Sequence, residues 1–206
     1  MMRRIERQNT GLMAPGQDLV AAGMAGLAGA AVLAERRRAE LLSWFSADYL
    51  EEIISRRRQL RERMAAFPDQ SQVMAEFSHC GITEAEFSGE GGILRTIWNL
   101  SGAYETGVEF YLRRIPVTQG TIEICERLEV NPYRLYSRDC WLLAAENGGR
   151  LAKELESRGI FAAVIGRVRT GIAREMVVQE GRGFLERPQP DELLRLIPDF
   201  TLEQEP

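Results

Sequence analysis

The stretch Cys140-Trp141-Leu142-Leu143-Ala144-Ala145 decides the fold that the sequence predicts. Six uncharged and mostly apolar residues in a row are typical of a strand that is buried on both faces. A helical segment from Gly148 to Ser157 follows, and residues 161–168 (Phe-Ala-Ala-Val-Ile-Gly-Arg-Val) predict a second buried strand. A strand, a helix and another strand in direct succession indicate a sheet that is covered by helices.

Two further strands are expected around this unit. Residues 108–112 alternate apolar and polar side chains, which predicts a half-buried strand ended by Pro116. Residues 175–178 predict another strand, which the hairpin-like turn Arg169-Thr170-Gly171 joins to residues 161–168.

The remaining segments predict helices. Residues 23–64 have helical spacing, with Ser46 as the expected N-cap of a second helix there, and Thr118 is expected to cap another. Residues 69–77 predict a short helix, and the glycine-bearing segment 81–92 leads into one more. The fold class is therefore α+β, layered as α/β/α, with a mixed sheet covered by helices.

Composition limits the function. With 206 residues, of which 45% are hydrophobic, the chain can bury one substantial core. We expect an N-terminal arm (1–15), one domain (16–197) and an acidic tail (198–206). The net charge of −4 argues against a nucleic-acid partner. The arginine runs 36–38 and 56–58 are interleaved with glutamates, which predicts solvated helix faces.

No membrane, disulfide or metal site is predicted. The uncharged segment 19–34 is too short to span a bilayer. The three cysteines show no paired spacing, which favours a cytoplasmic protein. His79 and Cys80 are adjacent, but neighbouring side chains usually point apart and no third orienting group is evident, so no catalytic residue is predicted.

Two glycine clusters could bind an anion at a helix start, because glycine allows close approach and the first N–H groups of a helix lack partners. The candidates are Gly26, Gly29, Glu90, Gly91 and Gly92. Neither cluster matches a P-loop or a dinucleotide fingerprint. For the first cluster, close helix packing or a dimer seam is the favoured alternative, with Gly23, Leu27 and Ala30 as interface candidates. For the second cluster, a simple turn is the alternative.

Several ordered stretches carry a family resemblance. They are Gly-Gln-Asp-Leu-Val (16–20), Gly-Leu-Ala-Gly (26–29), Val-Leu-Ala (32–34), Glu-Gly-Gly-Ile-Leu (90–94), Ile-Pro-Val (115–117), Ile-Glu-Ile-Cys (122–125), Asn-Pro-Tyr-Arg-Leu (131–135) and residues 159–168. Together they resemble the C-terminal domain of AIR-synthase-related (PurM-like) proteins, in particular the branch similar to the hydrogenase maturation factor HypE.

The resemblance carries expectations about ligands. In that family an N-terminal domain, paired across a dimer, supplies most contacts to ATP and magnesium. The C-terminal domain brings glycine-rich helix starts close to the phosphates, and Asn131 would lie near the substrate. Since fifteen residues precede Gly16, we expect the N-terminal half to be absent. ATP and magnesium are the only cofactors implied.

Departures from the family pattern suggest lost chemistry. Ala28 and Ala30 stand where the family has an acidic residue and a threonine, and Phe87-Ser88-Gly89 replaces an Asp-Val-Thr or Asp-Ile-Thr motif. Arg138-Asp139 replaces a small Ser-Gly turn, which would crowd a pocket. Each of the first two changes removes a group that could orient phosphate or metal.

Three functions remain open. The leading hypothesis is a module that is not catalytic alone and either dimerises or docks a protein that supplies the missing N-terminal domain. The second is a subunit of an ATP-dependent maturation or purine-synthesis enzyme, completed by such a partner. The third is a sensor that binds a nucleotide or small ligand.

Overall fold

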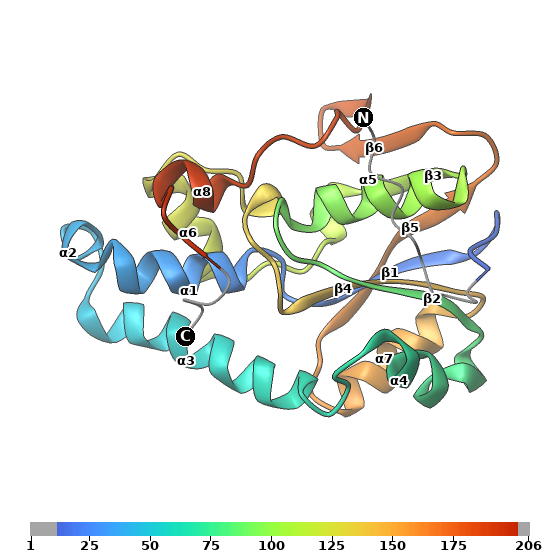
Figure 1. The fold of residues 1–206 in the computed structure, drawn as a ribbon, viewed down its shortest axis with the longest axis horizontal. Helices are drawn as coiled ribbons and strands as arrows, with labels where there is room; N and C mark the ends of the chain where they lie inside the picture. The colour runs from blue at the N-terminus through green and yellow to red at the C-terminus, as the bar shows by residue number, and fades with distance from the viewer. Residues whose placement is uncertain (1–11, 202–206) are drawn as a thin grey trace.

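The computed structural model describes residues 12–201, which form a seven-stranded mixed sheet in the order β2-β4-β1-β5-β3-β6-β7 (Figure 1). The strands are β1 (Asp18–Gly23), β2 (Ile82–Phe87), β3 (Gly107–Tyr111), β4 (Cys140–Ala145), β5 (Ala162–Arg169), β6 (Arg174–Val178) and β7 (Gly181–Phe184). β3 and β6 run parallel, and the other neighbouring strands run antiparallel. The α+β prediction is confirmed.

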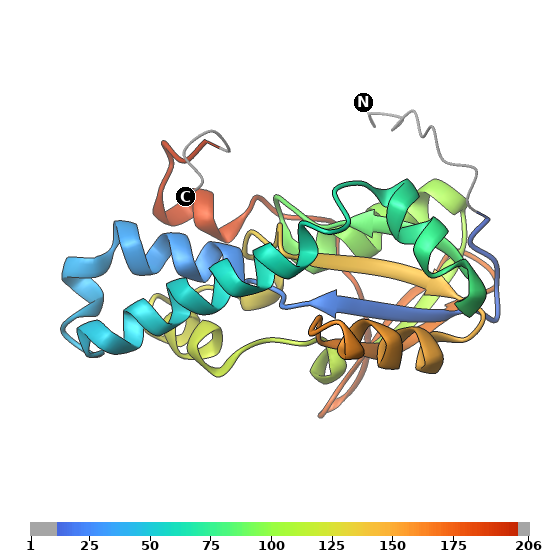
Figure 2. The same ribbon diagram turned by 90° about the horizontal axis from the view of Figure 1, so that it is seen from below.

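Helices cover both faces of the sheet. They are α1 (Leu27–Arg36), α2 (Arg38–Leu41), α3 (Ala47–Met64), α4 (Gln70–Glu76), α5 (Gly92–Tyr104), α6 (Gln119–Arg127), α7 (Gly148–Ser157) and α8 (Glu192–Leu196), with short 3-10 turns η1 (Ser78–Cys80), η2 (Leu112–Arg114) and η3 (Pro132–Arg134). α5 lies on one face, and α4 and α7 lie on the other (Figure 1). α1 and α3 run side by side and project beyond the strands (Figure 2).

Local chemistry explains several element boundaries. Ser46 Oγ accepts a hydrogen bond from the Tyr49 amide at the start of α3, and Thr118 Oγ1 accepts one from the Thr121 amide at the start of α6. Both side chains satisfy an N–H that has no partner inside its helix. The two predicted caps are therefore confirmed, as are β4 and α7.

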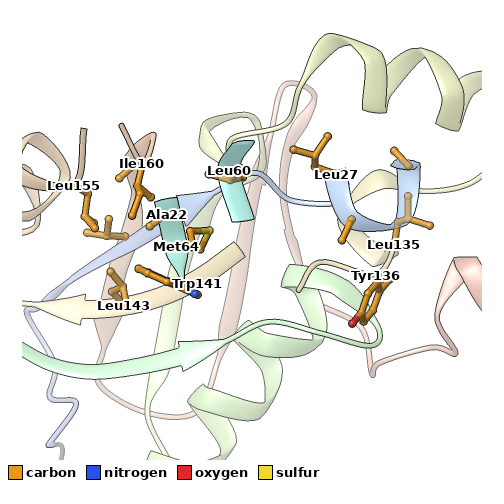
Figure 3. Packing of buried hydrophobic residues seen from close by; sticks show 14 of the residues in the cluster. Ala22, Leu27, Leu60, Met64, Leu135, Tyr136, Trp141, Leu143, Leu155 and Ile160 are labelled. Atoms are coloured by element: carbon orange, nitrogen blue, oxygen red, sulfur yellow. The ribbon is translucent and has the colours of Figure 1, made fainter. Parts of the chain in front are cut away.

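The core has two parts, because neighbouring residues of a strand point to opposite faces of the sheet. On one face, Ala22 of β1 and Trp141 of β4 pack with Leu60 and Met64 of α3 (Figure 3). On the other face, Leu142 belongs to the cluster that contains residues of α5. This two-sided burial accounts for the continuous apolar sequence of β4.

Four elements were not foreseen, and one predicted pairing is wrong. β1, β2, β7 and α8 were not predicted from the sequence. β6 follows β5 in the chain, but in the sheet β3 lies between these two strands and pairs with both. The turn at residues 169–171 therefore does not close a hairpin.

Two expectations about the exposed regions also need revision. Arg57, in the run predicted to be a solvated face, is only 3% exposed. Phe200, in the predicted acidic tail, packs its ring against Tyr136 at 5.6 Å between ring centroids. The predicted arm at residues 1–11 and the tail at 202–206 lie outside the described residues. Within residues 12–201, no helix is both long enough and apolar enough to cross a membrane.

Candidate functional site

The two predicted glycine clusters meet at one chain segment. Gly26 precedes α1, and Gly92 begins α5. Residues 132–135 pass so close that a Cβ on Gly26 would lie 2.6 Å from the Pro132 carbonyl oxygen, and one on Gly92 would lie 2.4 Å from the Tyr133 carbonyl oxygen. Only glycine allows such an approach, and both residues also have positive φ angles.

Close packing also accounts for the other small residues of the first cluster. A Cβ on Gly29 would lie 2.5 Å from the Leu135 side chain, and one on Gly23 would lie 2.2 Å from the Asp139 carbonyl oxygen. Leu27 and Ala30 are completely buried. Gly23, Leu27 and Ala30 thus pack within the chain, and their role as interface residues remains a prediction that this burial disfavours.

The amides of the predicted anion-binding glycines have acceptors within the protein. The Gly26 amide donates to Ser137 Oγ at 2.8 Å, and the Gly29 amide donates to the Tyr136 carbonyl at 2.9 Å. The Gly91 amide donates to Asp191 Oδ2, and the Gly92 amide donates to the Gly89 carbonyl at 3.1 Å. A phosphate at these amides would have to displace an internal partner.

Asp191 is the polar centre of this region. Its side chain is 1% exposed and accepts hydrogen bonds from the backbone amides of Gly91, Tyr136 and Leu193. Burial raises the pKa of this carboxyl, although the three N–H donors oppose the rise. Asp191 thus places an internal carboxylate at the helix start where the family resemblance would place a phosphate. The sequence signal for it was an aspartate directly before a short apolar helical run, which is a capping pattern.

The two remaining candidates make local contacts. Glu90 Oε1 accepts from Arg95 Nη1 at 2.7 Å, and Asn131 Oδ1 accepts from the Tyr133 amide at 2.9 Å, as expected of a turn. Binding of ATP and magnesium in this region remains a prediction. The geometry disfavours direct contact of a phosphate with the glycine amides, because these amides already have acceptors within the protein and the carboxylate of Asp191 lies beside them.

A cleft of about 730 Å³ lies between α3, the segment 113–120 and the start of β5, with Met24 beside it. We call it the docking cleft. It is lined by Met24, Tyr49, Glu52, Ile53, Arg56, Arg113, Arg114, Ile115, Pro116, Val117, Thr118, Gln119, Gly120, Phe161, Ala163 and Val164. A second hollow of about 430 Å³ along α3 shares Met24, Glu52, Arg56 and Phe161 with it.

The strand side of the docking cleft is partly open. β3 pairs with β5 only from Gly166 to Arg169. The Gly23 amide donates to the Phe161 carbonyl at 2.8 Å, so the backbone groups of Phe161 face β1. Because the backbone groups of successive residues in a strand face opposite sides, those of Val164, three residues further along, face away from β1. No strand of the described chain pairs with β5 at Val164 on that side.

The lining of the docking cleft combines apolar residues with three arginines and one glutamate. Arg56 pairs with Glu52 at 2.9 Å, whereas no carboxylate among residues 12–201 forms an ion pair with Arg113 or Arg114. Arg114 lies over the Tyr111 ring at 4.3 Å. Phe161 is 48% exposed and offers an apolar surface at the docking cleft.

One residue that lines the docking cleft, Tyr49, has a shifted pKa. Burial, together with a hydrogen bond to Glu123, raises the pKa of Tyr49 to about 12. Its hydroxyl therefore stays protonated near neutral pH.

Comparisons with known proteins support the fold. No family model and no curated protein matches the sequence. The chain is similar to HypE in complex with ATP (16% identity, TM-score 0.68, covering 90% of this chain and 55% of that one) and to HypE in the HypE–HypF complex (16%, 0.63, 86% and 55%). It is also similar to thiamine-monophosphate kinase from Stenotrophomonas maltophilia K279a (18%, 0.57, 85% and 52%).

These neighbours define the class of fold. The described chain has the fold of an AIR-synthase-like (PurM-like) C-terminal domain, and this confirms the resemblance seen in the sequence. It spans about half the length of the solved proteins, at 55–58% of the HypE chains. At such low identity the likeness establishes the fold and not the activity.

Proposed function

We propose that this domain is a non-catalytic protein-interaction module with an AIR-synthase-like fold. The proposal rests on the hydrogen bond that the Gly91 amide donates to the Asp191 carboxylate. A helix start of this kind binds an anion through free N–H groups, and here the protein supplies the anion itself. The scaffold is kept, while the position for a phosphate is filled by a structural side chain.

Titration with magnesium-ATP in a calorimeter tests the absence of nucleotide binding. We expect no saturable heat up to roughly 1 mM ATP, which corresponds to a binding free energy weaker than about −4 kcal/mol. HypE, which has been solved with ATP, is the positive control under the same conditions. One-site binding at micromolar concentration would contradict the proposal and favour the ATP-dependent alternatives.

The docking cleft is the proposed contact surface. The Phe161 side chain and the backbone of Val164 can bind an extended segment. Arg113 donates to Gln179 and Arg114 lies over the Tyr111 ring, but no described carboxylate forms an ion pair with either, so both favour acidic side chains in that segment. We therefore propose a cytoplasmic protein partner that presents an acidic, partly apolar peptide stretch. The solved HypE–HypF complex shows that a protein with this fold has a protein partner.

Selection from a random peptide display library tests the docking cleft. We expect enriched peptides to combine acidic and apolar residues. The double substitution Arg113→Glu and Arg114→Glu should weaken their binding by about tenfold or more, because two attractions become repulsions. Arg187→Glu is the matched control, since Arg187 is exposed and does not line the cleft.

Two results would overturn the choice of surface. One is equal binding by the double variant and the wild type. The other is a concentration-dependent dimer in sedimentation that the double variant also forms, because it would place a second copy of the chain on another face.

A further inference from the structure

Three potential metal ligands meet at the edge of the domain, away from the docking cleft. The side-chain ligand atoms of His79, Cys80 and Glu154 all lie within 4.8 Å of one another. His79 Nε2 is 2.8 Å from Glu154 Oε1. Cys80 is 1% exposed, whereas the His79 and Glu154 side chains are 41% and 31% exposed. The cluster thus has a buried thiol below two accessible ligands.

The backbone holds the two parts of the cluster together. His79 and Cys80 belong to η1, and Glu154 lies in α7. The Glu146 amide donates to the Gly81 carbonyl at 3.0 Å, and the Asn147 amide donates to the Cys80 carbonyl at 3.3 Å. These bonds fix η1 against the start of α7. The ligand atoms are therefore brought together by the fold and not by one flexible loop.

The donor set has a clear chemical preference. A thiolate, an imidazole and a carboxylate are the ligands of zinc-class divalent ions, which bind sulfur at about 2.3 Å and nitrogen or oxygen at about 2.0–2.2 Å. Around a tetrahedral ion such ligands lie roughly 3.3–3.7 Å apart. Ligand atoms within 4.8 Å of one another need only a small side-chain adjustment to reach this arrangement.

We propose that His79, Cys80 and Glu154 form a three-ligand site for a zinc-class divalent ion, with the fourth position open to water. The ion would sit between His79 and Glu154 in place of their present hydrogen bond. The Cys80 thiol would release its proton to solvent on binding.

An ordinary surface ion pair explains only part of the cluster. A histidine–glutamate pair needs no thiol beside it, yet the buried sulfur of Cys80 lies next to both side chains. Arg150 Nε, 3.4 Å from Glu154 Oε1, is the nearby positive charge that opposes metal binding. Its side chain is 53% exposed, so it can turn toward solvent when an ion binds.

Cobalt(II) titration of protein without a histidine tag tests the proposal. We expect a thiolate-to-cobalt charge-transfer band that saturates at one equivalent and disappears when zinc is added. Cys80→Ala should abolish the band, and Glu154→Gln should weaken zinc binding by about tenfold or more. Cys125→Ala is the matched control, because Cys125 is also a free, buried cysteine but is not part of the cluster.

The single histidine of the sequence gives a second readout that does not depend on a cysteine substitution. On addition of zinc, the ring signals of His79 in a nuclear magnetic resonance spectrum should move to a new position, and the zinc concentration needed for half of this shift should be about tenfold or more higher in Glu154→Gln. An absent charge-transfer band, a band that persists in Cys80→Ala, or unmoved His79 signals would overturn the proposal.

Discussion

Asp191→Ala is expected to lower the free energy of unfolding by about 3–5 kcal/mol, one of the two largest effects of a single substitution proposed for this protein. The carboxylate accepts from the amides of Gly91, Tyr136 and Leu193, which belong to three separate chain segments. Its removal leaves three amide donors without their acceptor, each with a cost of about 1–3 kcal/mol, partly offset where water enters.

Urea unfolding followed by fluorescence measures the stability loss, and hydrogen exchange shows where it arises. We expect faster exchange at Gly91, Tyr136 and Leu193, while the buried strand β4 remains protected. Asp199→Ala is the control, because its side chain is 79% exposed and lies 3.9 Å from its ion-pair partner Arg36. A loss below about 1 kcal/mol for Asp191→Ala would show that Asp191 does not join the three segments.

The elements predicted correctly are those whose signal is local. β4 shows a continuous apolar run, and Ser46 and Thr118 precede helical patterns as caps. The pairing of β6 was wrong because a short turn after β5 suggested a hairpin, whereas the position of β3 between the two strands depends on contacts far apart in sequence. β1 was missed because its apolar residues run almost directly into those of α1, and only the three residues 24–26 separate the strand from the helix.

The candidate site likewise combines features that a local sequence pattern predicts with features that depend on distant segments of the chain. The glycines were recognised, but not their joint packing against residues 132–135, because no sequence pattern links α1 to α5. Asp191 lies 100 positions from Gly91, and Glu154 lies far along the chain from His79. The docking cleft likewise combines residues of α3 with residues at the start of β5. Sites built from distant segments require the tertiary structure.

Arg57→Ala is expected to destabilise the domain by about 3–5 kcal/mol. Arg57 Nε lies 3.1 Å from Asp139 Oδ2, and the two side chains are only 4% and 5% exposed. Removal of the guanidinium leaves a buried carboxylate without this partner, which costs more than the loss of an exposed pair. Thermal unfolding followed by circular dichroism, combined with urea titration, provides the measurement.

Arg56→Ala provides a matched control one position away in the same helix. Arg56 pairs with Glu52, and both side chains are more than half exposed at 56% and 59%, so we expect a change within about 0.5 kcal/mol. The double variant Arg57→Met with Asp139→Leu should cost less than Arg57→Ala, because it removes both charges and refills the space. Equal losses of unfolding free energy for Arg57→Ala and Arg56→Ala would contradict the stabilising role of the buried Arg57–Asp139 pair. A smaller loss in the double variant would show that the cost of Arg57→Ala comes from leaving the buried Asp139 carboxylate without the Arg57 guanidinium.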